Sequence, residues 1–193
     1  MSRNRIEFLE PNELLAVLKI ARQRSARDWA ALLLTYSHGL RASETCGLKL
    51  SDLKSGILSV QRLKGSAYTS QQLMPHKGNP LLDETRAVRE YLRVRPKDSG
   101  DALFISQKGG HLHRSQLFRI YRDIAAAAGL PANKRHVHVL KHSLCSHLVQ
   151  GGANLARIQK YAGHSSISST VRYITVTDSE AAREAHNALM SIF

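Results

Sequence analysis

Residues 26–44 read ARDWAALLLTYSHGLRASE, and this stretch decides the centre of the fold. Its apolar residues, Trp29 and the leucines among them, recur at helical spacing and predict a helix over residues 26–38. Gly39 ends that helix, because glycine adopts the left-handed conformation typical of a helix C-terminus at little steric cost. The segment at 42–46 then predicts a second, short helix.

Helical spacing predicts more helices on either side of this stretch. The first opens at Pro11, and the others are expected at residues 84–95, 115–128, 139–150, 155–161, 167–173 and 179–190. Two β-rich runs, at 56–63 and 68–74, interrupt the helical pattern, and the turn at 64–66 between them predicts a hairpin. A short extended run is expected at 101–106. The predicted fold class is mainly α with a small antiparallel β-sheet (α+β).

The balance of charge indicates a polyanionic partner. The 193 residues include 28 Lys and Arg against 15 Asp and Glu, a formal net charge of +13. A field of that sign attracts nucleic acids and anionic membrane surfaces. No apolar run approaches the roughly 18 residues that span a bilayer, and the first residues do not form a secretory signal. We therefore expect a single domain over residues 1–193 that is cytoplasmic and has no membrane contact.

The two cysteines argue against a disulfide or a metal pair. Cys46 and Cys145 lie far apart in the sequence and next to helical apolar positions. Buried free thiols in a reducing compartment are therefore expected.

Five short polar segments stand out, and their order matters more than any one of them. They are HGLRASE at 38–44, RLKG at 62–65, HVLKH at 138–142, AGH at 162–164 and STVRY at 169–173. Taken alone, each has an ordinary explanation. Arg41 could bind the last carbonyls of the preceding helix, and Lys64 at a turn is usually a solvated charge.

The histidines and the tyrosine have ordinary explanations as well. His138 and His142 lie four residues apart on an expected helix, a spacing that metal sites use. No third ligand of fitting spacing accompanies them, so we expect no metal site. His164 after a glycine could lie beside a helix cap, and Tyr173 could be a half-buried packing residue.

Taken together, the five segments resemble the catalytic set of the tyrosine recombinase, or phage integrase, family. Members carry Arg-x-x-Glu, a Lys on a β-hairpin, His-x-x-Arg, a Gly-His pair, and a nucleophilic Tyr nine residues after that His. The matching residues here are Arg41 with Glu44, Lys64, His138, Gly163 with His164, and Tyr173. The interval of 23 residues from position 141 to His164 is also the family's usual one. The resemblance runs from about Glu13 to about Ile174 and implies the fold of a tyrosine recombinase catalytic domain.

The sequence departs from the family pattern in two places. Most members begin with a separate helical DNA-clamping domain, for which this chain has no room, so it looks more like the short recombinases of the fimbrial phase-switch type. A fragment of a longer enzyme would look the same. The second departure is Lys141, which stands where the family has its second arginine. Lysine keeps the charge but loses the planar two-pronged contact to phosphate.

Three explanations for Lys141 stay open. The chain is a natural, slower variant, or it carries a change engineered to trap a complex, or it is a catalytically weakened DNA-binding regulator on the recombinase scaffold.

The resemblance implies strand transfer without a cofactor, ATP or a metal ion. Tyr173 attacks phosphorus and forms a 3′-phosphotyrosyl link, which stores the ester energy for rejoining. Lys64 protonates the leaving 5′ oxygen, and His138 accepts the tyrosine proton or shares a non-bridging oxygen.

The remaining catalytic residues are assigned to the charge of the transferring phosphate. Arg41, Lys141 and His164 stabilise the non-bridging oxygens, where negative charge accumulates. Glu44 holds a neighbouring basic group in place and carries no proton.

Basic residues on the expected DNA-facing segments predict contacts to double-stranded DNA, mostly to phosphates. They are Arg62, Lys108, Arg114, Arg119, Arg122, Lys134 and Arg135. Arg119 and Arg122 could equally form a solvated helix face.

The tail at 178–193 has an apolar edge, which we expect to dock on a neighbouring protomer. The family builds a cyclic tetramer on paired DNA sites in this way, from a free monomer or dimer. A DNA-bending accessory protein is a further possible partner.

Two other classes fit less well than a site-specific recombinase. A type IB topoisomerase shares the tyrosine chemistry, but the segments match recombinases almost word for word. An RNA-binding module would need clustered aromatic platforms, and aromatic residues make up only 6% of this chain. The expected activity is DNA integration, excision or inversion in a bacterial, phage or mobile-element setting.

Overall fold

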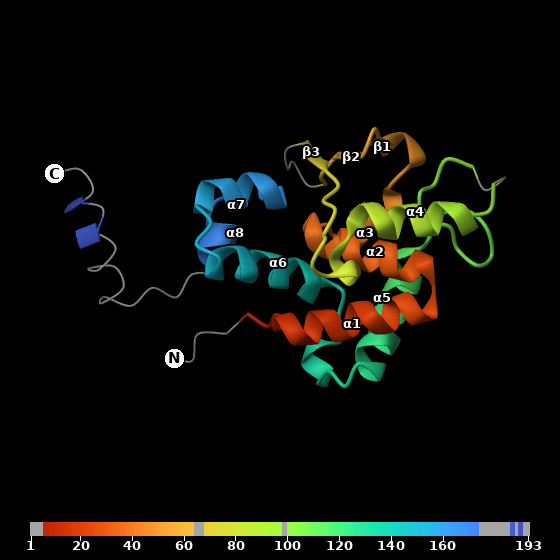
Figure 1. Cartoon of the computed structure of the whole chain (residues 1–193), viewed down its shortest axis with the longest axis horizontal. Coiled ribbons are helices and arrows are strands. Elements are labelled where there is room, and N and C mark those ends of the chain that lie inside the picture. Colours follow the sequence, from red (N-terminus) through yellow and green to blue (C-terminus); the bar gives the residue numbers. More distant parts are fainter. Residues whose placement is uncertain (1–5, 64–67, 98–99, 174–185, 188, 191–193) are drawn as a thin grey trace.

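Helix α2 (Ala26–Ser37) lies at the centre of the fold, and α1 (Pro11–Arg24), α4 (Glu84–Val94) and α6 (His138–Gln150) pack against it. The structure is a computed structural model, and it describes residues 6–63, 68–97, 100–173, 186–187 and 189–190. Figure 1 shows α6 running from this centre toward one end of the molecule, where it meets α7 (Leu155–Ala162) and α8 (Ser168–Val171).

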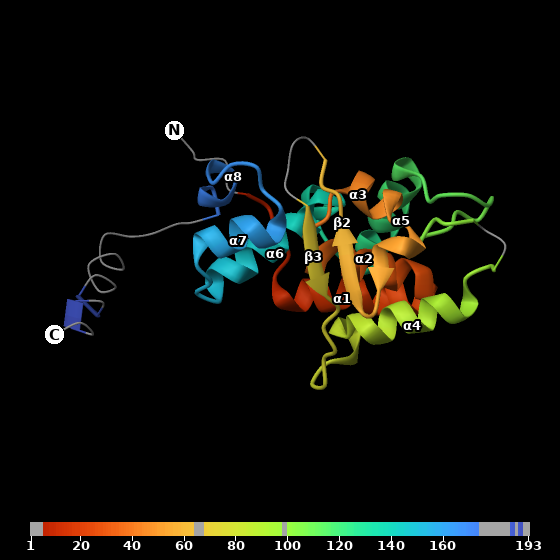
Figure 2. The ribbon, with the colours of Figure 1, turned by 90° about the horizontal axis from the view of Figure 1, so that it is seen from above.

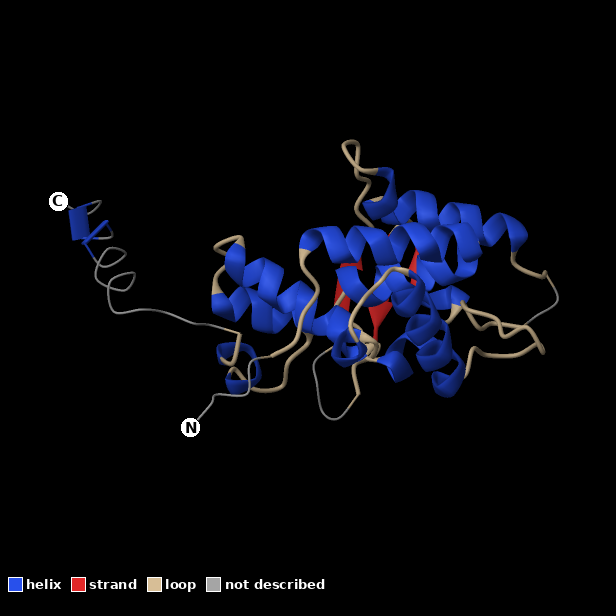
Figure 3. Ribbon diagram, turned by 90° about the horizontal axis from the view of Figure 1, so that it is seen from below, coloured by secondary structure: helices blue, strands red, loops and turns tan. Residues whose placement is uncertain are grey.

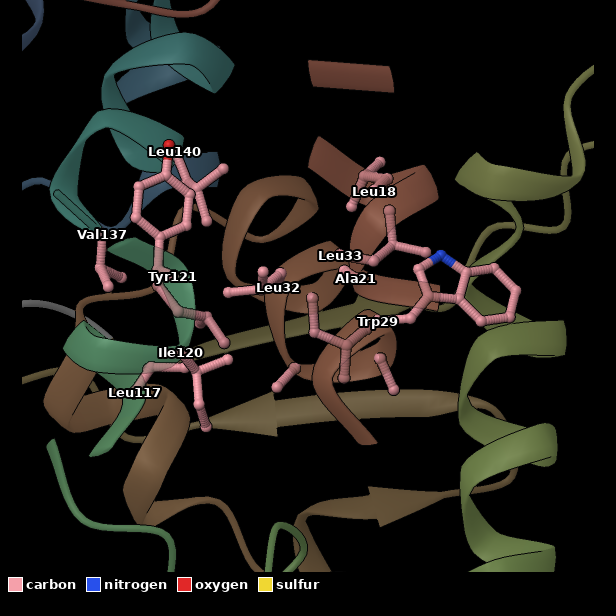
Figure 4. Close-up of a cluster of buried hydrophobic side chains, with 14 of the residues drawn as sticks. Leu18, Ala21, Trp29, Leu32, Leu33, Leu117, Ile120, Tyr121, Val137 and Leu140 are labelled. Carbon is pink, nitrogen blue, oxygen red and sulfur yellow. The ribbon is translucent and has the colours of Figure 1, made fainter. Parts of the chain in front are cut away.

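Helix α2 is buried on almost every side because its sequence is apolar on almost every side. It starts at Ser25, whose hydroxyl oxygen accepts a hydrogen bond from the backbone N–H of Asp28 at 3.0 Å. Figure 4 shows the core around it, formed by Trp29, Leu32 and Leu33 of α2, Leu18 and Ala21 of α1, Leu117, Ile120 and Tyr121 of α5 (Arg114–Ala127), and Val137 and Leu140 at the start of α6. Each fully buried leucine contributes roughly 1.5–3 kcal/mol to folding.

A small antiparallel sheet, shown in red in Figure 3, lies among the helices. Its strands are β1 (Leu53–Lys54), β2 (Ile57–Val60) and β3 (Thr69–Gln72), in the order β1-β2-β3. The β2–β3 hairpin was predicted, with Val60 paired to Thr69 at its end. Strand β1 was not predicted, because two residues are too short to show a period. The extended run predicted at 101–106 forms only isolated bridges to other segments.

The helices predicted up to residue 173 are confirmed within a few residues, and so is the mainly α fold class with a small antiparallel sheet. The helix predicted at 179–190 lies outside the described residues apart from 186–187 and 189–190. Helix α3 (Ala42–Gly47) follows the Gly39 turn, and α8 is shorter than the predicted 167–173. Single turns of 3-10 helix lie at Leu50–Asp52, Pro80–Leu82 and Ala132–Lys134. Lys64, and the tail at 178–193 apart from residues 186–187 and 189–190, lie outside the described residues.

The second half of α6, together with α7 and α8, surrounds a smaller apolar cluster. Cys145, Ile158 and Ala162 are buried there, and Tyr173 packs against them. Both cysteines are free and buried, as predicted. In the part of the chain that the structure describes, no helix has the length and apolar composition to cross a bilayer.

Candidate active site

The turn between α2 and α3 holds Arg41 in place. Gly39 has a φ of +56°, and a Cβ atom there would lie 3.0 Å from the side chain of Leu144, so the position favours glycine. The backbone N–H of Arg41 donates to Glu44 Oε2 at 2.8 Å, and its Nη1 donates to Glu44 Oε1 at 2.7 Å. The Arg41 side chain remains 26% exposed. Its guanidinium is therefore fixed by Glu44 and still accessible to an anion.

Glu44 is the anchor of the residues around Arg41. Its side chain is fully buried, and each carboxylate oxygen accepts two hydrogen bonds. Besides the two from Arg41, they come from Arg62 Nη1 at 3.2 Å and the backbone N–H of Leu63 at 3.1 Å. Burial alone would raise the pKa of Glu44, but these donors hold it below its usual value. Glu44 is therefore a charged acceptor that orients both arginines.

Arg62 is buried, so the prediction that it contacts phosphate was wrong. Its side chain has no exposed surface, and four of its five N–H groups are bonded inside the protein. Nε donates to Thr69 Oγ1 at 2.9 Å, Nη1 to Gly39 O and to Glu44, and Nη2 to His38 O at 2.7 Å. This arginine ties the hairpin to the end of α2.

Lys64 lies outside the described residues, but the residue before it is well placed. Leu63 donates its N–H to Glu44 and accepts from Arg41 Nη1 at 3.3 Å. The base of the segment that carries Lys64 is therefore bonded directly to Arg41.

Lys141 lies on α6 and is only 4% exposed. Its ammonium donates to the carbonyls of Gly39 and Ala162, both at 2.7 Å. Burial, followed by the positive charge of Arg62, lowers the pKa of Lys141 to about 8. Two of its three N–H bonds therefore join the loop before Arg41 to the end of α7, which leaves one for an anion. Arg41, Glu44, Arg62 and Lys141 are called the Glu44 cluster below.

The turn after α7 places His164. Gly163 has a φ of +63°, and a Cβ atom there would lie 2.9 Å from Arg62 Nε. The His164 ring is bonded through Nδ1 to Thr170 Oγ1 at 2.9 Å. Burial and the nearby positive charges of Lys141 and Arg41 lower the pKa of His164 to about 4, so the ring is neutral at physiological pH. When Thr170 donates to Nδ1, the ring proton is on Nε2, where it can donate to a substrate.

Tyr173 lies between α6 and His164. Its hydroxyl is 2.6 Å from His142 Nδ1, and its ring is nearly parallel to that of His164, with centroids 6.5 Å apart. His138 was predicted to accept the tyrosine proton or to share a non-bridging oxygen, and the structure pairs the hydroxyl with His142 instead of His138. His138 is more exposed and contacts the His142 ring edge-on, at 4.5 Å between centroids. His138, His142, His164 and Tyr173 are called the Tyr173 cluster below.

His142 is the residue of this site that the sequence interpretation missed. It was considered only as half of a metal pair or as a histidine with its hydrogen bonds satisfied. Across the described residues, no group of three or more His, Cys, Asp or Glu is arranged to hold a metal ion. The available signal was its position next to Lys141, because successive helical residues point about 100° apart. Lys141 therefore faces the Glu44 cluster while His142 faces α8.

The outer basic residues divide into two groups. Lys108, Arg114, Arg119 and Arg122 are exposed. Lys134 instead forms an ion pair with Glu13 at 2.7 Å, and Arg135 Nε donates to the Leu130 carbonyl at 2.7 Å. In Figure 2, α8, α3 and α5 lie along the same side of the molecule. The exposed residues are therefore better placed than Lys134 and Arg135 for contacts outside the protein.

The phage integrase family model matches residues 7–180. The chain belongs to the phage integrase family. It is 39% identical over 166 residues to the type 1 fimbriae regulatory protein FimE of Escherichia coli (strain K12), a match that covers 83% of this chain and 78% of FimE. The resemblance found in the sequence is thereby confirmed.

Solved structures of recombinases share the fold. The crystal structure of XerA recombinase has a TM-score of 0.78 at 24% identity and covers 96% of this chain and 66% of XerA. The XerH site-specific recombinase bound to its difH substrate has a TM-score of 0.77 at 23% identity, over 96% of this chain and 55% of XerH. At these identities the likeness establishes the fold, which is that of a tyrosine recombinase catalytic domain, as predicted.

Proposed function

We propose that this chain is a site-specific DNA recombinase that breaks and rejoins strands through a covalent link to Tyr173. The observation that carries the proposal is the position of the Tyr173 hydroxyl, which is bonded to a histidine and lies beside His164. Next to it, the Glu44 cluster contains three basic side chains and only one carboxylate. That arrangement supplies a nucleophile and an excess of positive charge to one phosphate.

In the proposed reaction, the Tyr173 oxygen attacks phosphorus and the 5′ oxygen leaves. Arg41 faces the non-bridging oxygens with its exposed side, His164 donates from Nε2, and Lys141 contributes its remaining N–H bond. Lys64, on the loop that follows Leu63, protonates the leaving oxygen. The product is a 3′-phosphotyrosyl ester and a free 5′-hydroxyl, and attack by another 5′-hydroxyl rejoins the strand. Neither ATP nor a metal ion takes part, because the ester conserves the bond energy.

Double-stranded DNA is the proposed substrate, and XerH, one of the similar structures, is bound to its own DNA site. Phosphate contacts are proposed for four exposed basic residues, Lys108, Arg114, Arg119 and Arg122. Assembly into a tetramer on paired sites, with the tail at 178–193 exchanged between protomers, remains part of the proposal.

A second candidate is a DNA-binding regulator that cuts poorly. The observation in its favour is Lys141, whose ammonium is already bonded to two carbonyls where the family has an arginine. On this view the phosphate is held by Arg41 and His164 alone.

Covalent capture tests both candidates. The protein is incubated in EDTA with a supercoiled plasmid library that carries fragments of its source genome, and the reaction is quenched with SDS. DNA linked to protein is then recovered and sequenced. A recombinase yields nicked DNA joined to the protein at defined sites, and Tyr173→Phe yields none.

The Lys141→Arg variant separates the two candidates. Adducts from the unaltered protein support the recombinase, and an increase with Lys141→Arg of up to about tenfold would reflect the two-pronged contact that lysine lacks. Adducts that appear only after Lys141→Arg support the regulator. Adducts that persist in Tyr173→Phe would show that another residue is the nucleophile.

A further inference from the structure

The Tyr173 hydroxyl has a hydrogen-bond partner that the family motif does not name. The Tyr173 hydroxyl and His142 Nδ1 are 2.6 Å apart, at the short end of the range for hydrogen bonds in proteins. His138, which the motif leads one to expect in this role, contacts the His142 ring and not the tyrosine. His142 directly follows Lys141 on α6. The same turn of this helix therefore positions Lys141, which faces the proposed phosphate, and His142, which bonds to Tyr173.

The surroundings of His142 keep its ring in a form that can accept this hydrogen bond. Burial, and then positive charge on His138, His136, Arg172 and Lys141, lower the pKa of His142 to about 4. The ring is therefore neutral at physiological pH, and a neutral ring can accept a hydrogen bond at Nδ1 while carrying its proton on Nε2. Burial, followed by the Cys145 thiol, raises the pKa of Tyr173. The hydroxyl therefore stays protonated and needs a base before it can attack.

We propose that His142 is the catalytic residue that accepts the Tyr173 proton, a role that rests on the proposed function of this chain. As the phenol O–H bond breaks, its proton moves to the Nδ1 lone pair of His142, and the phenolic oxygen forms its bond to phosphorus. The 5′ oxygen leaves with the electron pair of the broken P–O bond and takes a proton from Lys64. On rejoining, the neutral amine of Lys64 takes the proton of the attacking 5′-hydroxyl, and the imidazolium returns its proton to the departing tyrosine oxygen.

Substrate binding would make His142 a better base than it is in the free protein. The groups that act on it are His138 and Lys141 on its own helix, Arg172 and Tyr173 after α8, and His136 before α6, while Cys145 acts on Tyr173. A phosphate bound beside Lys141 offsets the positive charge that lowers the pKa of His142. The pKa of His142 should therefore rise from about 4 toward neutrality when DNA is bound, which is the range in which a general base works best.

The first test compares cleavage by two His142 variants at the site recovered by covalent capture. In His142→Asn, a side-chain oxygen replaces Nδ1, so a hydrogen bond can form but no proton can be taken up. In His142→Ala, both functions are lost. General-base catalysis typically contributes 10²–10⁴-fold, so we expect each variant to lose at least about 100-fold in single-turnover cleavage. His76→Asn, a change at an exposed histidine in the loop before α4, is the matched control and should cleave normally.

Two readouts separate a base from a packing residue. Cleavage by His142→Asn should rise about tenfold per pH unit above neutrality, because hydroxide must then deprotonate the tyrosine, whereas the unaltered protein should be nearly independent of pH there. Added imidazole should restore cleavage by His142→Ala and should have no effect on Tyr173→Phe. A structural role predicts neither result.

A measurement without DNA tests the geometry on its own. In ¹⁵N-histidine NMR spectra of the free protein, His142 should be the Nε2–H tautomer, and its Nδ1 signal should shift in Tyr173→Phe. An Nδ1–H tautomer would overturn the proposal.

The kinetic outcomes distinguish this proposal from the proposed function. Normal cleavage by the His142 variants would overturn the role of His142 and leave Tyr173 as the nucleophile. Faster cleavage would overturn it too, and would mean that the hydrogen bond restrains the tyrosine. If the unaltered protein forms no adduct that depends on Tyr173, both proposals fall together.

Discussion

The Glu44 cluster and the Tyr173 cluster are neighbours, but they are held by different parts of the molecule. The Glu44 cluster lies against the main hydrophobic core, and its charged groups are bonded to one another and to backbone carbonyls. The Tyr173 cluster lies against the smaller cluster of Cys145, Ile158 and Ala162. Lys141 joins the two, since it bonds to Gly39 on one side and Ala162 on the other.

This difference matches the tasks of the two clusters in strand transfer. Fixed positive charge stabilises a developing negative charge best when it does not need to rearrange, which favours a buried, fully bonded setting. In the proposed reaction, Tyr173 holds one 3′ end while a new 5′-hydroxyl takes the place of the one that left. Segments with few buried apolar contacts open more readily than a core, which favours a smaller support. The comparison predicts that substitutions in the Glu44 cluster cost more stability than matched ones near Tyr173.

The largest effect is expected from Arg62→Met. The substitution leaves Glu44 with one arginine and deprives the carbonyls of His38 and Gly39 of a donor. Removing one partner of a buried ion pair typically costs about 3–5 kcal/mol, so urea unfolding should show a loss of that size. Arg119→Met, at an exposed position, is the control and should change stability by less than about 0.5 kcal/mol. Equal losses in both variants would mean that Arg62 does not anchor the cluster.

The burial of Arg62 is a feature that the sequence could not predict. Its place near a hairpin tip suggested an exposed charge, because local pattern cannot reveal what lies across the fold. The space for its side chain depends on Gly163, about 100 residues away, where a Cβ atom would lie 2.9 Å from Arg62 Nε. The helices were predictable because their apolar residues repeat every three to four positions.

The candidate catalytic residues were found for a different reason, which is that their types and spacings match a family. That match located Arg41, Glu44 and Tyr173, but it could not show which histidine of the third segment meets the tyrosine. His138 and His142 differ by one helical turn, and only the folded chain shows that the hydroxyl of Tyr173, after α8, meets His142.

The second effect concerns Lys141 and depends on pH. In the unfolded chain its pKa lies near 10.5, whereas in the folded protein it is about 8. Between these values the unfolded chain binds a proton that the folded protein has released, so stability rises with pH through this window. A shift of this size corresponds to about 3 kcal/mol.

Urea unfolding between pH 7 and pH 10.5 checks this prediction. The unaltered protein should gain stability relative to Lys141→Met as the pH rises, because methionine fills much of the same space without a charge. Parallel curves for the two proteins would mean that Lys141 keeps its proton in the folded state.

The smallest effect comes from a matched pair of Thr→Val substitutions, one in each region. Thr69 accepts from Arg62 Nε, and Thr170 bonds to His164 Nδ1, both at 2.9 Å. Both threonines are buried, but their partners differ, since Arg62 has no exposed side-chain surface whereas the His164 ring is half-buried. Thr69→Val therefore leaves a charged donor without a partner or water, which should cost about 1–3 kcal/mol. Thr170→Val should cost less than about 1 kcal/mol, because water can reach the half-buried ring.

Urea unfolding of the two variants checks this difference. Equal losses of stability would mean that the Tyr173 cluster is held as firmly as the Glu44 cluster. The mobility inferred for Tyr173 would then have to come from residues outside the Tyr173 cluster.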